Sequence, residues 1–303
     1  MRVLSDFDAW LALLVVAAAL LYACGVARVW RKAGIGRGIR VADAVRFALG
    51  VAAVALALLS PLDALAGQSF ALHMIEHETL MVVAAPLLVL ARPLEAWVWA
   101  FPRQDVRRAA ATAARGAAVV RAWRATTLPV VATCVHAVAL WIWHAPALFA
   151  AALDSLPLHV LQHACFFASA LAFWWAVFGG AARAPRPVSL ACLFTTMLHT
   201  SALGAVLTFA PTAWYMHGAA HVLGLSPLED QQLGGLVMWI PGGVAYVVGA
   251  LAVARTWLAR PRALAIEQVH HASGASRDES DWSGHRATRV GPPRGRVRAQ
   301  RAC

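Results

Sequence analysis

The chain has 303 residues, 60% of them hydrophobic and only 14% charged, with a formal net charge of +11. Because charged residues make up about a quarter of soluble domains, this composition excludes an ordinary soluble protein and indicates an integral membrane protein. The positive charge does not require a nucleic acid partner, since basic cytoplasmic loops and attraction to anionic lipids account for it.

Seven apolar runs are each long enough, at about 20 residues, to cross a bilayer as a helix. We therefore predict an all-α, polytopic membrane protein whose transmembrane domain, residues 1–255, is a seven-helix bundle. The first run is too long for the core of a signal peptide, so it is expected to remain as the first helix. Pro241 is expected to kink the last helix, because proline removes a backbone donor. The runs are residues 9–30, 42–60, 70–91, 127–144, 157–178, 188–210 and 233–254.

Arginine and lysine gather in the connections after the first, third and fifth predicted helices and in the tail, whereas the other connections hold acidic residues instead. Because basic loops stay on the cytoplasmic side, the N-terminus is predicted to lie outside and the C-terminus inside. Residues 256–303 mix Ser, Gly, Pro and Arg without an apolar period. They are predicted to form a disordered cytoplasmic tail, with membrane lipids as the expected partners.

Histidines occur three times as a pair with a spacing of four residues. Side chains four apart share one face of a helix, about 5–6 Å from each other, so one metal ion can bind both imidazoles. The predicted topology brings the three pairs and His144 to the outer membrane face, although a histidine at an interface can also be held by hydrogen bonds alone. We predict one metal site formed by His73, His77, His144, His159, His163, His217 and His221.

Methionines beside these histidines favour copper. Imidazole binds zinc, copper, iron or nickel, whereas thioether sulfur favours Cu(I). Met74 adjoins His73, and Met81 lies one turn beyond His77. Copper is therefore the predicted ion and zinc the alternative, with Met74, Met81, Glu76 and Asp230 as secondary candidates for the site.

A second hypothesis comes from the stretch His73-Met74-Ile75-Glu76-His77, which matches the H-x-x-E-H motif of inverted zinc proteases. In that motif two histidines hold zinc and the glutamate activates water. The motif is short, and no separate downstream carboxylate ligand stands out. A membrane-embedded zinc metallohydrolase is thus the alternative function. A third possible function is that of a protein that binds haem through two histidines, but haem ligation does not explain why the histidines of each pair are four residues apart.

Four blocks of the sequence follow one another in a recognisable order. They are His73–His77 with Ala85–Pro93, Trp141–Pro146, His159–His163 with Phe173–Trp175, and Asp230–Gly235 with Met238–Gly242. In this order they resemble the CtaG-like assembly factors of caa3-type cytochrome c oxidase. The resemblance covers about residues 40–255 and implies a multi-pass protein of the bacterial inner membrane. It also implies a non-enzymatic role in building a haem-copper oxidase, with oxidase subunits as partners and copper handling as the task. In that family the position of Glu76 is often not glutamate, which argues against a catalytic base.

Overall fold

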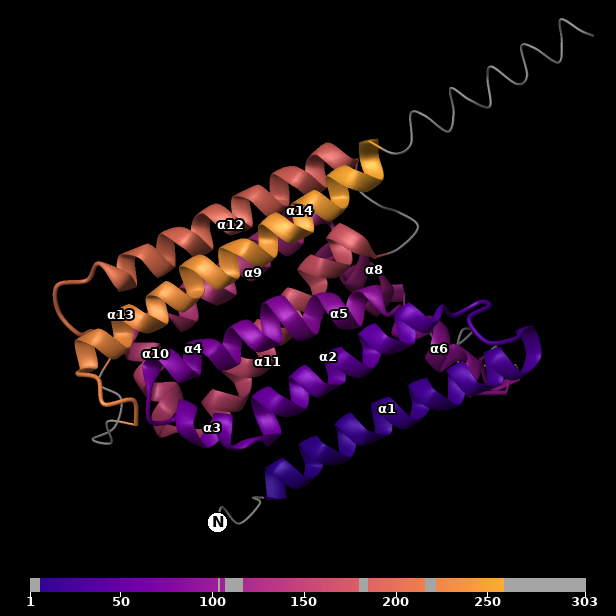
Figure 1. Cartoon of the computed structure of the whole chain (residues 1–303), viewed down its shortest axis with the longest axis horizontal. Helices are drawn as coiled ribbons and strands as arrows, with labels where there is room; N and C mark the ends of the chain where they lie inside the picture. The colour runs from indigo at the N-terminus through magenta and orange to yellow at the C-terminus, as the bar shows by residue number, and fades with distance from the viewer. Residues whose placement is uncertain (1–5, 103, 107–116, 180–184, 216–221, 259–303) are drawn as a thin grey trace, which may run out of the picture. The chain divides into compact units, whose positions relative to one another are not determined.

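A computed structural model describes residues 6–102, 104–106, 117–179, 185–215 and 222–258. All the regular structure in these ranges is helical, and none of it is β-strand (Figure 1). The chain divides into two units, Met1–Ala254 and Arg255–Cys303, and the helices that carry the site belong to the first. The prediction of an all-α fold is confirmed, whereas the disorder and location of the tail stay predictions.

Within the part of the chain that the structure describes, six helices are long and apolar enough to cross a membrane. Four of them are uninterrupted, and the other two contain a π-helical turn, η1 (Thr79–Ala84) or η2 (Met238–Gly242). Leu14, Phe194 and Leu251 on these helices are each at least 60% exposed, as side chains that face lipid would be. The spans are α1 (Asp6–Ala33), α2 (Val41–Leu59), α4 (Phe70–Glu78) with η1 and α5 (Ala85–Leu90), α11 (Leu156–Phe178), α12 (Arg186–Thr208), and α13 (Pro227–Val237) with η2 and α14 (Gly243–Leu258).

The fourth predicted span is shorter than expected. Helix α9 (Pro129–Trp143) has 15 residues, which at 1.5 Å per residue extend over about 22 Å, less than the roughly 30 Å of a hydrocarbon core. Helix α8 (Ala117–Thr126) precedes it, and the two are bent by 79°. Proline disfavours helical backbone at the residue before it, so Pro129 explains the break. The bundle has seven spans when this bent pair counts as one.

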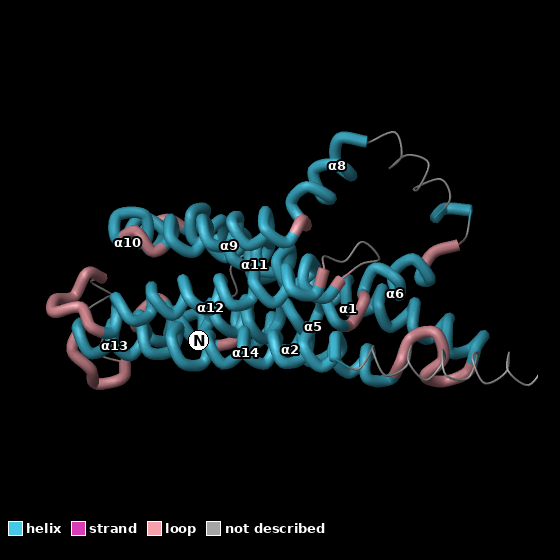
Figure 2. The backbone as a smooth tube through the Cα atoms, turned by 90° about the horizontal axis from the view of Figure 1, so that it is seen from above, coloured by secondary structure: helices cyan, strands magenta, loops and turns pink. Residues whose placement is uncertain are grey.

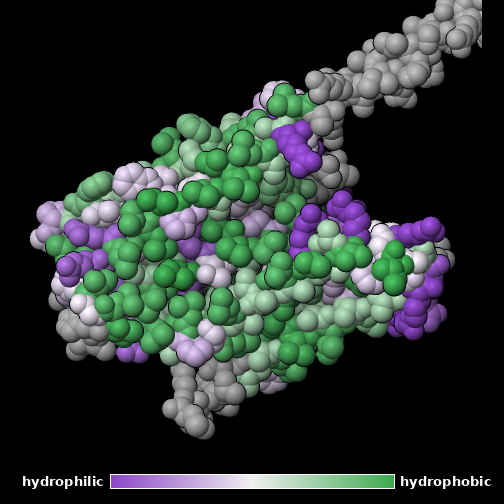
Figure 3. Space-filling model, viewed as in Figure 1, coloured by the Kyte–Doolittle hydropathy of each residue, from purple (hydrophilic) through white to green (hydrophobic). Residues whose placement is uncertain are grey.

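Short helices occupy the connections at the two ends of the bundle. Helix α10 (Pro146–Asp154) and the start of α13 lie at one end, and α6 (Pro93–Ala100) and α8 lie at the other (Figures 1 and 2). Apolar residues cover much of the visible flank between the ends (Figure 3). The connections therefore alternate between the ends as a polytopic bundle requires, and the direction in which the bundle crosses the membrane stays a prediction. Helix α3 (Pro61–Ala66) joins α2 to α4.

The π-helical turns accompany the two prolines inside spans, Pro86 and Pro241. A π-helical bond would run from residue i to residue i−5, so Pro86, which has no N–H, leaves the carbonyl of Met81 without its donor. The indole N–H of Trp174 donates to that oxygen over 2.9 Å. The last span continues as one helix through Pro241 by way of η2, so the turn at this proline is widened, and the expected kink stays a prediction.

Helices α12 and α13 approach closely at two glycines. A Cβ atom added to Gly235 would lie 2.7 Å from the carbonyl oxygen of Gly204, and one added to Gly204 would lie 2.7 Å from the carbonyl oxygen of Gly235. Small residues allow such backbone contact between membrane helices. This contact sets α13 against α12 and so fixes the position of Asp230 one turn earlier.

We expect Gly235→Ala to lower the free energy of unfolding by about 1–3 kcal/mol, because the added methyl group must push the two backbones apart. Thermal melting of the detergent-purified protein measures this loss. Gly67→Ala is the matched control, since the nearest atom to its added Cβ is 3.7 Å away. Equal melting temperatures for the two variants would contradict the close packing.

Candidate metal centre

Two histidine pairs meet between helices α4 and α11. Within each pair the ring centroids are 4.3 Å apart for His73 and His77 and 4.4 Å apart for His159 and His163. Between the helices, His73 lies 5.4 Å from His159, and His77 lies 5.0 Å from His163. We call these four residues the histidine cluster. Its members come from parts of the sequence more than 80 residues apart, and the structure brings both predicted pairs to one place.

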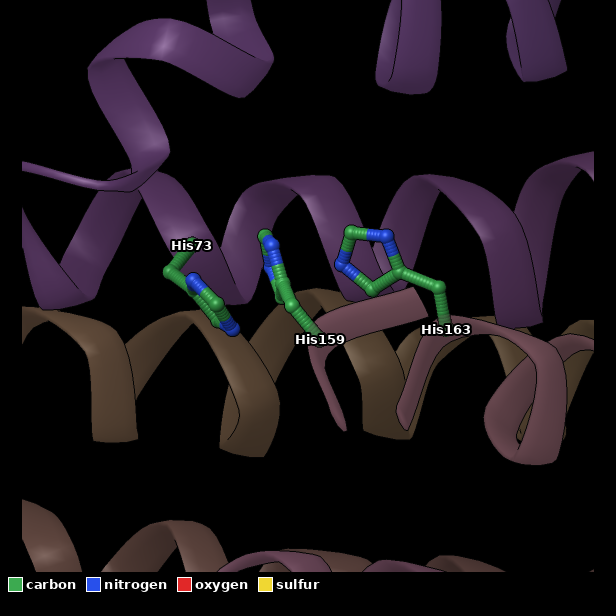
Figure 4. Close-up of side chains that lie close together, drawn as sticks. All are labelled: His73, His159 and His163. Atoms are coloured by element: carbon green, nitrogen blue, oxygen red, sulfur yellow. The ribbon is translucent and has the colours of Figure 1, made fainter. Parts of the chain in front are cut away.

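Three members have the geometry of a metal site. One ring nitrogen each from His73, His159 and His163 can be chosen so that all three atoms lie within 4.8 Å of one another, and Figure 4 shows the three rings side by side. A metal–nitrogen bond is about 2 Å long, so two ligands on one ion are at most about 4 Å apart. Small rotations of the side chains would therefore bring the three nitrogens onto one ion.

The cluster has a buried side and a more accessible side. His73 and His77 are 0% and 1% exposed, whereas His159 and His163 are less completely buried, with 12% of the His163 side chain exposed. Both ring nitrogens of His77 are buried and make no hydrogen bond with any described residue. Buried polar atoms are nearly always hydrogen-bonded in proteins, so these two nitrogens are available to a bound ion.

Glu76 lies beside the cluster on α4. Its side chain is fully buried, and Oε1 is 3.8 Å from Nε2 of His163. A carboxylate at this distance can offset the charge of a bound cation or orient a ligand histidine. The structure thus gives Glu76 a place near the ion without making it one of the three closest ligands.

His144 belongs to a different part of the site, next to Met74. It follows the last residue of α9, where its Nδ1 lies 2.7 Å from the carbonyl oxygen of Leu140. Its Nε2 lies 3.4 Å from Sδ of Met74. Phe166 packs against both His144 and the cluster, with its ring centroid 5.8 Å from that of His144 and 4.6 Å from that of His77. The Nε2 atom of His144 thus faces the methionine, and its predicted role as a metal ligand stays a prediction.

Met81 is buried in the large apolar core around Phe173 and Trp174. Met74 instead packs in a second apolar cluster that includes Phe70 and Phe149. The two methionines predicted as secondary candidates therefore lie in different surroundings, and Met74 is the one in contact with a candidate histidine.

Asp230 holds the start of α4. Its carboxylate accepts hydrogen bonds from the Ser69 hydroxyl over 2.7 Å, from the Phe70 N–H over 2.6 Å and from the Ala71 N–H over 3.1 Å. The first N–H groups of a helix lack partners within it, and here a carboxylate from α13 supplies them. Asp230 thus supports the helix that carries His73 and His77, in a different role from the ligand role that we considered.

Gln231 fixes the chain that reaches His144. Its Oε1 accepts the backbone N–H of Trp214 over 2.6 Å and that of Tyr215 over 3.4 Å. The Tyr215 hydroxyl in turn donates to the carbonyl oxygen of His144 over 2.5 Å. Burial raises the pKa of this hydroxyl, so it stays protonated and remains a donor. The sequence did not lead us to Gln231 or Tyr215, although Gln231 stands in a block that we quoted for the family resemblance.

A family model described as cytochrome c oxidase caa3 assembly factor matches residues 20–260. This chain belongs to the caa3 assembly factor family. The resemblance predicted from its sequence blocks is confirmed, and the described histidines, Glu76, Met74 and Asp230 all lie inside the matched range.

Two mycobacterial relatives of this chain are uncharacterized protein Mb0105 of Mycobacterium bovis and uncharacterized protein MT0111 of Mycobacterium tuberculosis. Each is 26% identical over 286 residues, which cover 90% of this chain and 42% of the relative. The chain thus spans about two fifths of the length of these relatives. No solved structure matches it. The third predicted pair, His217 and His221, lies outside the described residues.

Proposed function

We propose that this caa3 assembly factor binds copper at the histidine cluster and supplies it to the oxidase during assembly. The observation that carries the proposal is the meeting of His73, His159 and His163 from two helices, with ligand atoms within 4.8 Å of one another. Neutral imidazole is a common ligand for copper and zinc. An oxidase of the haem-copper type needs copper. Copper as the cargo is therefore consistent both with the geometry of the histidine cluster and with the family.

The exposure of the cluster supports a transient site. Structural metal sites are closed and fully coordinated, whereas an ion that must be released needs a free coordination position and a way out. His159 and His163 are less buried than His73, and 12% of the His163 side chain is exposed, so they lie on the more accessible side of the cluster. We infer that copper enters and leaves past these two residues while His73 holds it from the buried side.

The proposed setting is the outer face of the bacterial inner membrane, with oxidase subunits as the partners that receive copper. The outer face is inferred from the predicted topology, in which α4 and α11 both begin at that side of the membrane. Both histidine pairs lie in the first two turns of these helices. We also place the protein among non-enzymatic assembly factors.

Metal analysis of the detergent-purified protein tests the proposal. We expect bound copper in the wild type, its loss in a His159→Ala/His163→Ala variant, and a parallel loss of caa3-type oxidase activity in cells that carry the variant. The copper content of the Gly67→Ala protein is the control for purification. Unchanged copper and unchanged oxidase in the double variant would overturn the proposal.

The alternative of a zinc metallohydrolase is not favoured, because the family is one of assembly factors. Glu76→Gln separates the two functions. Gln keeps the size of the side chain but cannot act as a general base, so a hydrolase would lose its activity. We expect the variant still to bind copper and to support oxidase assembly, with a copper affinity lowered by no more than about 10–100-fold, as for a residue outside the ligand shell. Loss of oxidase assembly with full copper content would favour the hydrolase.

A further inference from the structure

In one of the two neutral tautomers of His144, the contact between Met74 and His144 brings together two hydrogen-bond acceptors. The sulfur of methionine carries lone pairs and no hydrogen. His144 is 5% exposed, and burial favours its neutral form. In the tautomer whose Nδ1–H donates to the Leu140 carbonyl oxygen, Nε2 presents its own lone pair to Sδ at 3.4 Å. A soft cation is the species that both atoms can bind.

We propose that Met74 and His144 form a second, soft binding site for monovalent copper, next to the histidine cluster. This inference rests on the proposed function and deepens it, because it names the oxidation state of the cargo. Thioether sulfur selects Cu(I), whereas imidazole alone also accepts zinc and divalent copper.

The surroundings of Met74 favour an ion of low charge. Met74 is 0% exposed and packs with Phe70, Phe149 and Leu207 in one apolar cluster. The cost of taking an ion out of water rises with the square of its charge, so a monovalent ion is much cheaper to bury than a divalent one. Both donors are neutral, so the site suits Cu(I) better than zinc.

His77 links the soft site to the histidine cluster. It stands three residues after Met74 on α4 and so shares that helix face, and its ring lies 4.3 Å from His73 and 5.0 Å from His163. Its two buried nitrogens make no hydrogen bond with the described residues. Nε2 of His144 and Sδ of Met74 are only 3.4 Å apart, so an ion bound to both would have a bent N–Cu–S angle. A bent angle leaves a coordination position for a third ligand, such as His77. Copper can thus pass between the sites by exchange of neutral ligands, and it stays monovalent throughout.

The test uses Cu(I) alone, held reduced with ascorbate under anaerobic conditions, with a chromophoric Cu(I) chelator as the competitor. We expect Met74→Leu to lower the Cu(I) affinity of the purified full-length protein at least about tenfold, since even residues outside the ligand shell cost 10–100-fold. Zinc binding at the histidine cluster should not change. X-ray absorption at the copper edge should show a sulfur neighbour in the wild type and none in Met74→Leu.

Met238→Leu is the matched control, because Met238 is buried in the same apolar cluster and the exchange conserves volume equally. It should keep both the affinity and the sulfur neighbour. If Met74→Leu retains the affinity and the sulfur neighbour, the soft site is wrong while the histidine cluster stands. A wild type that binds zinc but no copper would overturn both this inference and the proposed cargo.

Discussion

Replacement of either His73 or His163 by alanine is expected to lower the copper affinity at least about 100-fold, and replacement of both to lower it little further. The two side chains come from different helices, and a nitrogen of each can lie within 4.8 Å of the other. If both bind one ion, the first substitution already destroys the site, so the losses of free energy do not add. Competition with a copper chelator for the wild type, both single variants and the double variant measures this cycle.

His199→Gln is the control for this cycle. His199 is a half-buried histidine on α12 whose ring nitrogens make no hydrogen bond with the described residues, and it lies outside the cluster. Its replacement should leave the copper affinity unchanged. Additive losses for His73 and His163 would mean that the two histidines bind separate ions, and an equal loss in His199→Gln would mean that copper binding responds to any lost histidine in the bundle.

The four histidines of the cluster could be predicted because two simple rules act together on them. A spacing of four residues places His73 beside His77 and His159 beside His163 on any helix. The alternation of charged connections then places both pairs in the first turns of helices that start at the same side. Neither rule requires α4 and α11 to be neighbours, so their contact is what the structure adds.

Other features depend on distances that no local pattern encodes. The ring of His144 is directed by the turn after α9 and by the Leu140 carbonyl oxygen, which helix periodicity does not describe. From the sequence, Asp230 is expected to cap its own helix. In the structure, Ser226 and Glu229 form the capping box of α13 instead. That leaves the Asp230 carboxylate free to bind α4. Pro129 could have indicated the break between α8 and α9. The predicted apolar run includes this proline, however, so hydropathy alone did not show that α9 is shorter than a full span.

Asp230→Ala is expected to lower the free energy of unfolding by about 2–4 kcal/mol and the copper affinity by at least about tenfold. The carboxylate accepts three hydrogen bonds from the start of α4. Its removal takes away all three of these bonds, and hydrogen bonds to charged groups contribute about 1.5–3 kcal/mol. Because His73 lies one turn further along α4, a frayed start moves this ligand away from His159 and His163. Thermal melting and chelator competition measure the two effects.

Glu229→Ala separates this role from ordinary helix capping. Glu229 adjoins Asp230, but its carboxylate serves only Ser226 among the described residues, at the start of α13 itself. Its loss should cost about 1 kcal/mol of stability, as for a helix cap, and leave the copper affinity unchanged. Asp230→Asn, which keeps one acceptor oxygen, should fall between wild type and Asp230→Ala in both measurements. If Asp230→Ala melts early yet binds copper as the wild type does, the first turn of α4 does not position His73, and the tie between α13 and the cluster concerns stability alone.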